Sequence, residues 1–117
     1  MRHSRQPVRC AFAALALVVT FAACTPQQAT NVAIHLIFGD HADEAHAVVE
    51  CESGHNHLAV SPDGSNHGLF QINNVHRSTF EQVTGKPWAD RYDPVLNTAF
   101  AKWLYDQQGW RPWSCRP

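Results

Sequence analysis

The sequence predicts a mainly helical α+β domain with one small β-hairpin and one disulfide. Three observations support this class. Apolar segments that stop at glycine recur along residues 30–109, a turn-rich segment follows residue 57, and two cysteines lie far apart behind an N-terminal apolar stretch. The chain has 117 residues, of which 44% are hydrophobic and 16% charged, a balance that suits one compact domain.

Residues 1–23 have the pattern of an export signal. Three arginines precede the apolar segment 11–23, which matches a signal-peptide core and is shorter than the ~20 residues of a membrane-spanning helix. The segment ends in Phe21-Ala22-Ala23-Cys24, which resembles a bacterial lipobox, where the cysteine is acylated. We therefore predict an exported protein that is lipid-anchored through Cys24 in the cell envelope. An uncleaved membrane anchor and ordinary secretion are the alternatives.

The rest of the chain divides into a polar tether, residues 24–30, and a domain, residues 31–117. Past the signal there are six Lys and Arg against ten Asp and Glu. Nucleic-acid binding needs clustered basic side chains, so this acidic balance argues against a nucleic-acid partner. We expect a monomer without a cofactor or a bound metal.

Cys51 and Cys115 are predicted to form a disulfide. Export places them in an oxidising compartment, and the other two cysteines are assigned to the signal and the lipid anchor. The pair is 64 positions apart, which is worth ~4 kcal/mol on the chain-entropy model. The alternative is a metal site of Cys51 with His55 and His57, although the usual Cys-x-x-Cys and His-x-x-x-His spacings are missing.

Two helices are expected before the turn-rich segment. Residues 30–38 form the first, with Thr30 as its cap and Gly39 as its stop. Asp40 is the expected cap of the second helix, which has acidic residues in its first turn, where the helix dipole favours them. That helix runs to about residue 53 and ends at Gly54.

A small irregular hairpin and a short helix follow. Residues 58–60 and 69–72 are the expected strands, with a Pro-Asp-Gly turn at residues 62–64. Ser78 and Glu81 have the spacing of a capping box, which opens a helix that ends at the next glycine.

The last helix is expected at residues 95–108. Asp93 and Pro94 supply a cap and a first-turn proline, and Gly109 ends it. Asn97 lies at the edge of its apolar face and is predicted to bond backbone. The core-facing stripe comprises Leu96, Phe100, Trp103, Leu104 and Gln107.

Glu52 is the candidate for acid–base chemistry. At about 100° per residue it lies some 40° from Val48, on the apolar face of its helix, whereas Glu50 lies about 160° from Val48 and points to solvent. Burial without a basic partner raises the pKa of a carboxyl, which then keeps its proton near neutral pH, as a general acid must. The alternative is that Glu52 caps a neighbouring loop through backbone N–H groups.

Three separated motifs carry a family resemblance. Cys51-Glu52-Ser53-Gly54-His55-Asn56, Ala59-Val60-Ser61-Pro62 and Gly68-Leu69-Phe70-Gln71-Ile72 resemble the lysozyme-like superfamily. The closest branch is the soluble-lytic-transglycosylase-like proteins of actinobacteria and their phages. The pair Asp93-Pro94 and the end of the chain from Gly109 to Cys115 resemble the last part of the same small secreted domain.

The resemblance covers about residues 32–115 and implies a lysozyme-like fold. It also implies a peptidoglycan glycan strand as substrate, cleaved at the β-1,4 bond between N-acetylmuramic acid and N-acetylglucosamine. Glu52 matches the catalytic glutamate of the family.

The resemblance also supplies candidate glycan contacts. Gly68 and Gln71 match a segment that lines the sugar cleft, where the glycine lets backbone approach the glycan, and Ser61 matches a cleft position. The alternative role for Gln71 is a hydrogen bond to the backbone at a strand edge. The alternative role for Ser61 is to form a turn without contacting the glycan. The chain lacks an Ala-Tyr-Asn motif of larger relatives, whose place Tyr92 or a tryptophan would take. The numerous histidines are interpreted as scattered surface residues rather than as muropeptide ligands.

Asp63 is the only candidate for a second catalytic carboxylate, and it lies in a plain turn signal. An inverting or a retaining hydrolase needs a second catalytic carboxylate. An enzyme whose substrate supplies its own nucleophile needs only one catalytic carboxyl. We therefore predict a lytic transglycosylase. A lysozyme-type muramidase and a catalytically weak glycan-binding lipoprotein are the alternatives.

Overall fold

The computed structural model describes residues 24–117, so the predicted export signal lies outside the described residues. The helices are α2 (Pro26–Phe38), α3 (Ala42–Ser53), α4 (Arg77–Thr84) and α5 (Pro94–Gln108). The strands are β1 (Asn66–His67) and β2 (Ile72–Asn73), and 3-10 turns occupy η2 (Gly39–His41), η3 (Asn74–His76) and η4 (Trp88–Tyr92). The predicted class, mainly α with a small hairpin, is confirmed, and the structure contains the predicted disulfide between Cys51 and Cys115. No helix among the described residues has the length and apolar character needed to cross a membrane.

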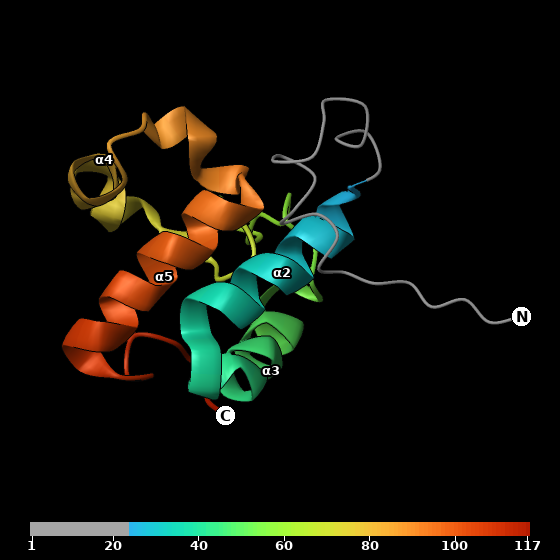
Figure 1. Ribbon diagram of the computed structural model, residues 1–117. Coiled ribbons are helices and arrows are strands. Elements are labelled where there is room, and N and C mark those ends of the chain that lie inside the picture. Colours follow the sequence, from blue (N-terminus) through green and yellow to red (C-terminus); the bar gives the residue numbers. More distant parts are fainter. Residues whose placement is uncertain (1–23) are drawn as a thin grey trace, which may run out of the picture.

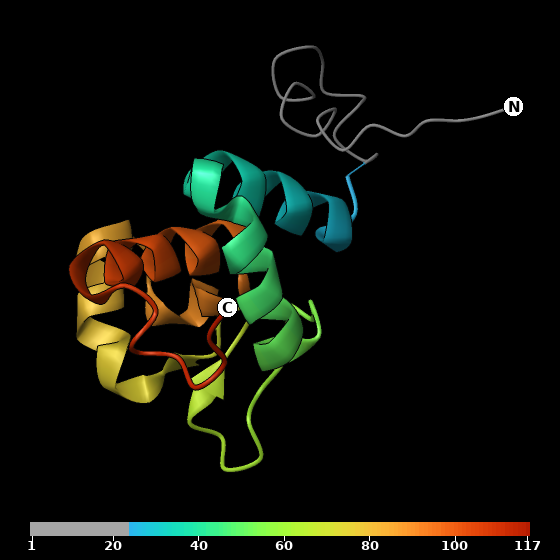
Figure 2. The ribbon, with the colours of Figure 1, turned by 90° about the horizontal axis from the view of Figure 1, so that it is seen from below.

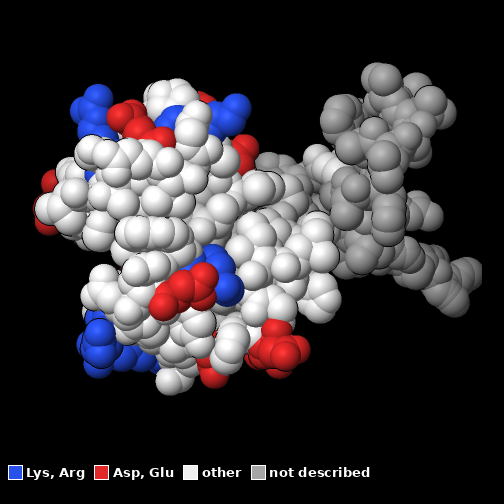
Figure 3. All heavy atoms as spheres, turned by 60° about the vertical axis from the view of Figure 1, so that its left-hand side comes forward, with Lys and Arg blue, Asp and Glu red and all other residues white. Residues whose placement is uncertain are grey.

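Helix α5 is the centre of the packing. It lies against α2 on one side and α4 on another, and α2 packs in turn against α3 (Figure 1). The chain after α5 turns back towards α3 (Figure 2). On the face in Figure 3, charged side chains of both signs are interspersed among broad uncharged areas. The largest fully buried apolar side chains, drawn from α2, α3, α4, α5 and the hairpin, are Ile34, Val48, Val49, Leu69, Phe70, Ile72, Phe80 and Phe100.

The first helix begins four residues earlier than expected, so the predicted tether at residues 24–30 is wrong from Pro26 onward. Thr25 is the N-cap, and its hydroxyl accepts the Gln28 N–H at 3.1 Å while the Gln28 side chain accepts the Thr25 N–H at 2.9 Å. Pro26 fits the first turn because its missing N–H would have no helical partner there. Thr30, the expected cap, is buried inside the helix.

Helix α3 also begins differently from the expectation. Asp40 lies in the 3-10 turn η2 and does not cap α3, whose N-cap His41 makes no capping bond through its side chain. The end is as predicted. Gly54 adopts the left-handed conformation, with φ of 60°, and its N–H bonds the Glu50 carbonyl.

The strands of the hairpin are formed by different residues from the expected ones. Strands β1 and β2 pair antiparallel, and Val60 adds a single bridge to His67. Residues 69–72 were expected to be a strand, but most of them form the turn between β1 and β2. Leu69 and Phe70 are fully buried there, which explains the misleading apolar pattern.

Helix α4 starts at Arg77 without a capping box, because the Glu81 carboxylate accepts the Trp88 N–H at 2.7 Å instead. Helix α5 begins at Asp93 as predicted, with its carboxylate accepting two N–H groups of the first turn. Gln107, expected on the core stripe, is exposed.

Candidate active site

Glu52 lies in the last turn of α3 and is half-buried. Its Oε2 accepts a hydrogen bond from the Cys115 N–H at 3.2 Å. Among the described residues, Oε1 has no hydrogen bond, and no basic side chain forms an ion pair with the carboxyl. Glu50 is exposed, as predicted. The alternative for Glu52, a cap of a neighbouring loop through a backbone N–H group, is therefore present, and it leaves one carboxyl oxygen without a hydrogen bond among the described residues.

The disulfide between Cys51 and Cys115 is present, as predicted. It joins the residue before Glu52 to the residue whose N–H bonds the Glu52 carboxyl. The C-terminal tail is therefore held against the end of α3 by a covalent bond and a hydrogen bond. Because the Cys51 sulfur is in this disulfide, the alternative metal site with His55 and His57 is excluded.

A series of backbone hydrogen bonds connects the end of α3 to the turn between the strands. The Ser53 carbonyl accepts the Asn56 N–H, and the Asn56 carbonyl accepts the Ala59 N–H, both at 3.0 Å. The Ala59 carbonyl then accepts the Gly68 N–H at 2.8 Å. The loop that follows Glu52 is thus held to the turn that contains Gln71.

Gln71 uses its amide group within the protein. Nε2 donates to the Ala59 carbonyl at 3.2 Å and to the Gly68 carbonyl at 3.0 Å. The backbone of Gln71 has a φ of 50°, which few residues other than glycine adopt. The backbone-bonding alternative is therefore realised: this side chain closes the turn beside the Glu52 loop.

Gly68 is needed for a contact inside the protein. A Cβ at this position would collide with the Asn97 carboxamide and lie 3.2 Å from the Arg91 carbonyl oxygen. Gly68 is also buried, so the close approach that we expected with a glycan is made with Asn97 instead.

Asn97 is the polar centre of the packing between α5 and the hairpin. It is 0% exposed, and its Nδ2 donates to the carbonyls of His67 and Arg91 at 3.1 and 2.9 Å. Its Oδ1 accepts the Phe70 N–H at 2.9 Å. The predicted structural role of Asn97 is confirmed.

Ser61 and Asp63 belong to one tight turn. Asp63 Oδ1 accepts the Ser61 hydroxyl at 2.8 Å, and the Ser65 hydroxyl and N–H at 2.7 and 3.0 Å. These hydrogen bonds, those from Ser65 first, lower the pKa of Asp63 to about 2, so this carboxylate is ionised at neutral pH. The turn alternative for Ser61 is what the structure shows.

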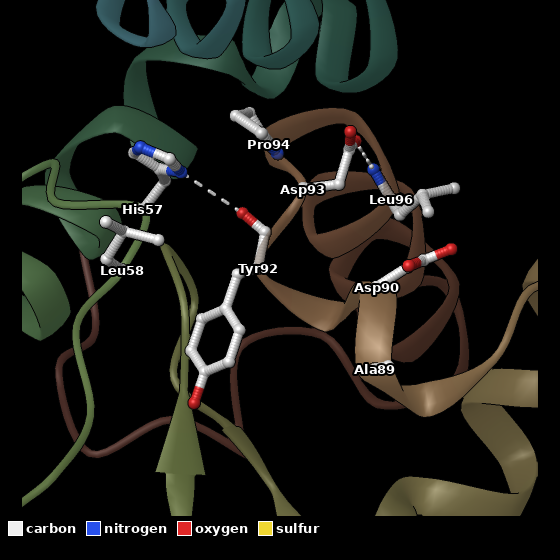
Figure 4. Close-up of a pocket in the computed structure, with 8 residues that line it drawn as sticks. All are labelled: His57, Leu58, Ala89, Asp90, Tyr92, Asp93, Pro94 and Leu96. Carbon is white, nitrogen blue, oxygen red and sulfur yellow. Dashed lines mark hydrogen bonds between the residues drawn. The ribbon is translucent and has the colours of Figure 1, made fainter.

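Tyr92 borders an open cavity of about 510 Å³ between the loop after α3 and the start of α5 (Figure 4). The His57 ring donates from Nδ1 to the Tyr92 carbonyl at 3.3 Å, joining the two sides. Of the predicted site residues, only Tyr92 lines this cavity. The cavity's lining residues are His57, Leu58, Ala89, Asp90, Tyr92, Asp93, Pro94 and Leu96.

A family model described as the transglycosylase SLT domain matches residues 26–109. The chain belongs to the SLT domain family. No curated protein and no solved structure matches it. The matched region begins at Pro26, the first residue of α2, and ends at Gly109, which stops α5. The SLT domain therefore includes the four α-helices that the structure describes and the hairpin, and it implies lytic transglycosylase activity on peptidoglycan.

Two features of this SLT domain escaped the sequence analysis. His67 is only 5% exposed, and its ring joins the Tyr92 hydroxyl and Asn74 Oδ1, each at 2.7 Å, so the histidines are not all surface residues. Trp113 donates from Nε1 to the buried Phe70 carbonyl at 2.9 Å. The tail thus contacts both the turn and Glu52. The expected strands, residues 58–60 and 69–72, did not include His67, so its place in β1 and its burial were not predicted.

Proposed function

We propose that this SLT domain is an exported lytic transglycosylase in which Glu52 is the single catalytic carboxyl. The bond cleaved is the β-1,4 bond between N-acetylmuramic acid and N-acetylglucosamine. The observation that supports this proposal is the asymmetry of the Glu52 carboxyl. One oxygen accepts the Cys115 N–H, and the other has no partner among the described residues.

This asymmetry suits a proton donor. The hydrogen bond from Cys115 orients the carboxyl through Oε2, and Oε1 carries the proton that protonates the glycosidic oxygen. The bond from that oxygen to C1 of N-acetylmuramic acid breaks, and the acetamido oxygen of the sugar stabilises the positive charge at C1. Glu52, now ionised, takes the proton of the C6 hydroxyl while that oxygen bonds to C1. The product is a 1,6-anhydro sugar, and Glu52 is protonated again without water.

Glycan contacts are proposed at Tyr92 and Gln71, which lie on two segments that hydrogen-bond to the loop after Glu52. Tyr92 presents a cavity wall, and the Oε1 atom of Gln71 has no partner among the described residues. Gly68 and Ser61 contribute by shaping the turns rather than by touching the sugar, because both are engaged within the protein.

We expect digestion of purified sacculi to release muropeptides with anhydro ends, which are one water lighter in mass spectrometry than hydrolytic products. The reason is that an inverting or retaining hydrolase needs a second carboxylate about 5–9.5 Å from the acid. Asp63→Asn should therefore retain activity, since the Asp63 carboxylate serves its turn.

The muramidase alternative predicts different products. Reducing ends alone, together with an Asp63→Asn variant as inactive as Glu52→Gln, would establish a lysozyme-type hydrolase. Ser65→Ala is the control for turn disruption, because it removes one hydrogen bond to Asp63 without changing the carboxylate.

We also propose that the protein is anchored in the cell envelope through acylation of Cys24. The lipobox-like segment before it supports this. Cys24 is disulfide-bonded in the structure, so acylation requires the reduced form that the cytosol maintains before export. Cys24→Ala should move the protein from the membrane fraction to the medium. Equal partitioning of Cys24→Ala and the unaltered protein would contradict the anchor, and Cys24→Ala should leave glycan cleavage unchanged.

A further inference from the structure

His46, His55 and Glu50 form a chain of polar contacts along the last turns of α3. His46 Nδ1 lies 3.3 Å from His55 Nε2, and His55 Nδ1 lies 2.8 Å from Glu50 Oε1. Both rings are half-buried. We propose that His46 Nδ1 and His55 Nε2 together bind one zinc ion, at a site separate from the Glu52 carboxyl.

The backbone holds His55 in an unusual conformation that directs it back along the helix. Gly54 and His55 both have a φ of 60°, in the left-handed region. Glycine adopts this region readily, but other residues do so rarely, and such strain concentrates at functional positions. The two consecutive left-handed residues bring the His55 ring to His46, which is nine positions earlier in the chain.

Glu50 determines which nitrogen of His55 is available. A carboxylate accepts only, so the proton of the His55 ring is on Nδ1, where it is donated to Glu50. The lone pair is then on Nε2, which faces His46. A carboxylate behind a histidine ring is the usual outer partner of a zinc-binding imidazole, because it orients the ring and increases its basicity.

The spacing of the two nitrogens suits zinc. Tetrahedral zinc binds imidazole nitrogens at about 2.0–2.1 Å, which places two such nitrogens about 3.3 Å apart. The observed separation is 3.3 Å. At this distance the His46 Nδ1–H can donate to His55 Nε2. On zinc binding the His46 ring proton moves to the other nitrogen of the same ring, which frees the Nδ1 lone pair without net release of a proton.

No group of three or more His, Cys, Asp and Glu residues in the part of the chain that the structure describes is arranged to hold a metal. The protein therefore supplies two ligands and water supplies the others, so the binding is weaker than at a closed four-ligand site.

Calorimetric titration of the purified, disulfide-bonded protein with zinc chloride at pH 7.5 tests the proposal. We expect saturable binding of one zinc per chain, with a heat that does not depend on the ionisation enthalpy of the buffer, because two neutral rings bind zinc without net release of a proton. His46→Ala and His55→Ala should each abolish the saturable binding. Glu50→Gln should weaken it about 10-fold or more, because it removes the orienting carboxylate.

His57→Ala is the matched control, since His57 is a half-buried histidine in the same loop but does not contact His46. It should bind zinc like the unaltered protein. Nitrogen NMR of the unaltered protein gives a measurement that does not depend on the folding of variants: zinc should shift His46 Nδ1 and His55 Nε2 most. The proposal is overturned if the protein shows no saturable binding, if His55→Ala binds as tightly as the unaltered protein, or if other histidine resonances respond instead.

Discussion

Glu52→Gln is expected to reduce the release of soluble muropeptides from purified sacculi by about 10³–10⁴-fold, the upper range for loss of a general acid and base. The amide oxygen can still accept the Cys115 N–H, so the geometry of the tail is maintained. What is lost is the proton that Oε1 would donate. The measurement is the initial rate of muropeptide release, with circular dichroism to verify folding.

Asp106→Asn is the matched control for this carboxyl-to-amide change. Asp106 pairs with Lys102 on the exposed side of α5, and such surface ion pairs contribute little to stability. It should cleave sacculi at the normal rate. Undiminished cleavage by Glu52→Gln would show that the catalytic carboxyl lies elsewhere. A protein that binds glycan but cleaves none, with or without the substitution, would instead support the glycan-binding lipoprotein.

Removal of the disulfide with Cys51→Ser and Cys115→Ser together is expected to lower the free energy of unfolding by ~4 kcal/mol, because the bond closes a loop of 64 residues in the unfolded chain. Small domains have total stabilities of about 5–15 kcal/mol, so this is a large fraction. We also expect a lower cleavage rate, since the Cys115 N–H that orients Glu52 is released. Urea unfolding followed by tryptophan fluorescence measures the stability.

Reduction provides the control for packing defects that serine introduces, with Cys24→Ala added to every sample because Cys24 is also disulfide-bonded. The reduced protein and the double variant should unfold at the same urea concentration. If the double variant were as stable as the oxidised protein, then the C-terminal contacts, such as the Trp113 bond to Phe70, would hold the tail without the disulfide.

Helix caps and helix ends, which depend on interactions between residues a few positions apart in the sequence, were predicted well. Gly54, Gly85 and Gly109 end their helices as expected, and Asp93 caps α5. These outcomes follow from local backbone chemistry, namely the left-handed conformation of glycine and the carboxylate that accepts free N–H groups.

Local patterns failed where two caps competed or where distant groups supplied the partner. Thr25 with Gln28 satisfies two N–H groups, and this capping box starts α2 before Thr30 could. Glu81 has the spacing of a capping box with Ser78, but the Trp88 N–H takes its carboxylate. The spacing of Ser78 and Glu81 in the sequence does not distinguish a capping box from a contact between Glu81 and Trp88.

The sequence by itself determined the family, the mainly helical class, the pairing of Cys51 with Cys115 and which of Glu50 and Glu52 lies on the exposed side of α3. Each of these follows from motif order, from cysteine number or from the 3.6-residue period of a helix. Only the tertiary structure decided which atoms surround Glu52. The Cys115 N–H is 63 positions away, and the hairpin register follows from the burial of Leu69 and Phe70 against the helices rather than from strand alternation. Contacts across such separations depend on how the whole chain packs. The burial of a residue can determine where a turn lies, and the hydrophobic pattern of the neighbouring sequence does not reveal this.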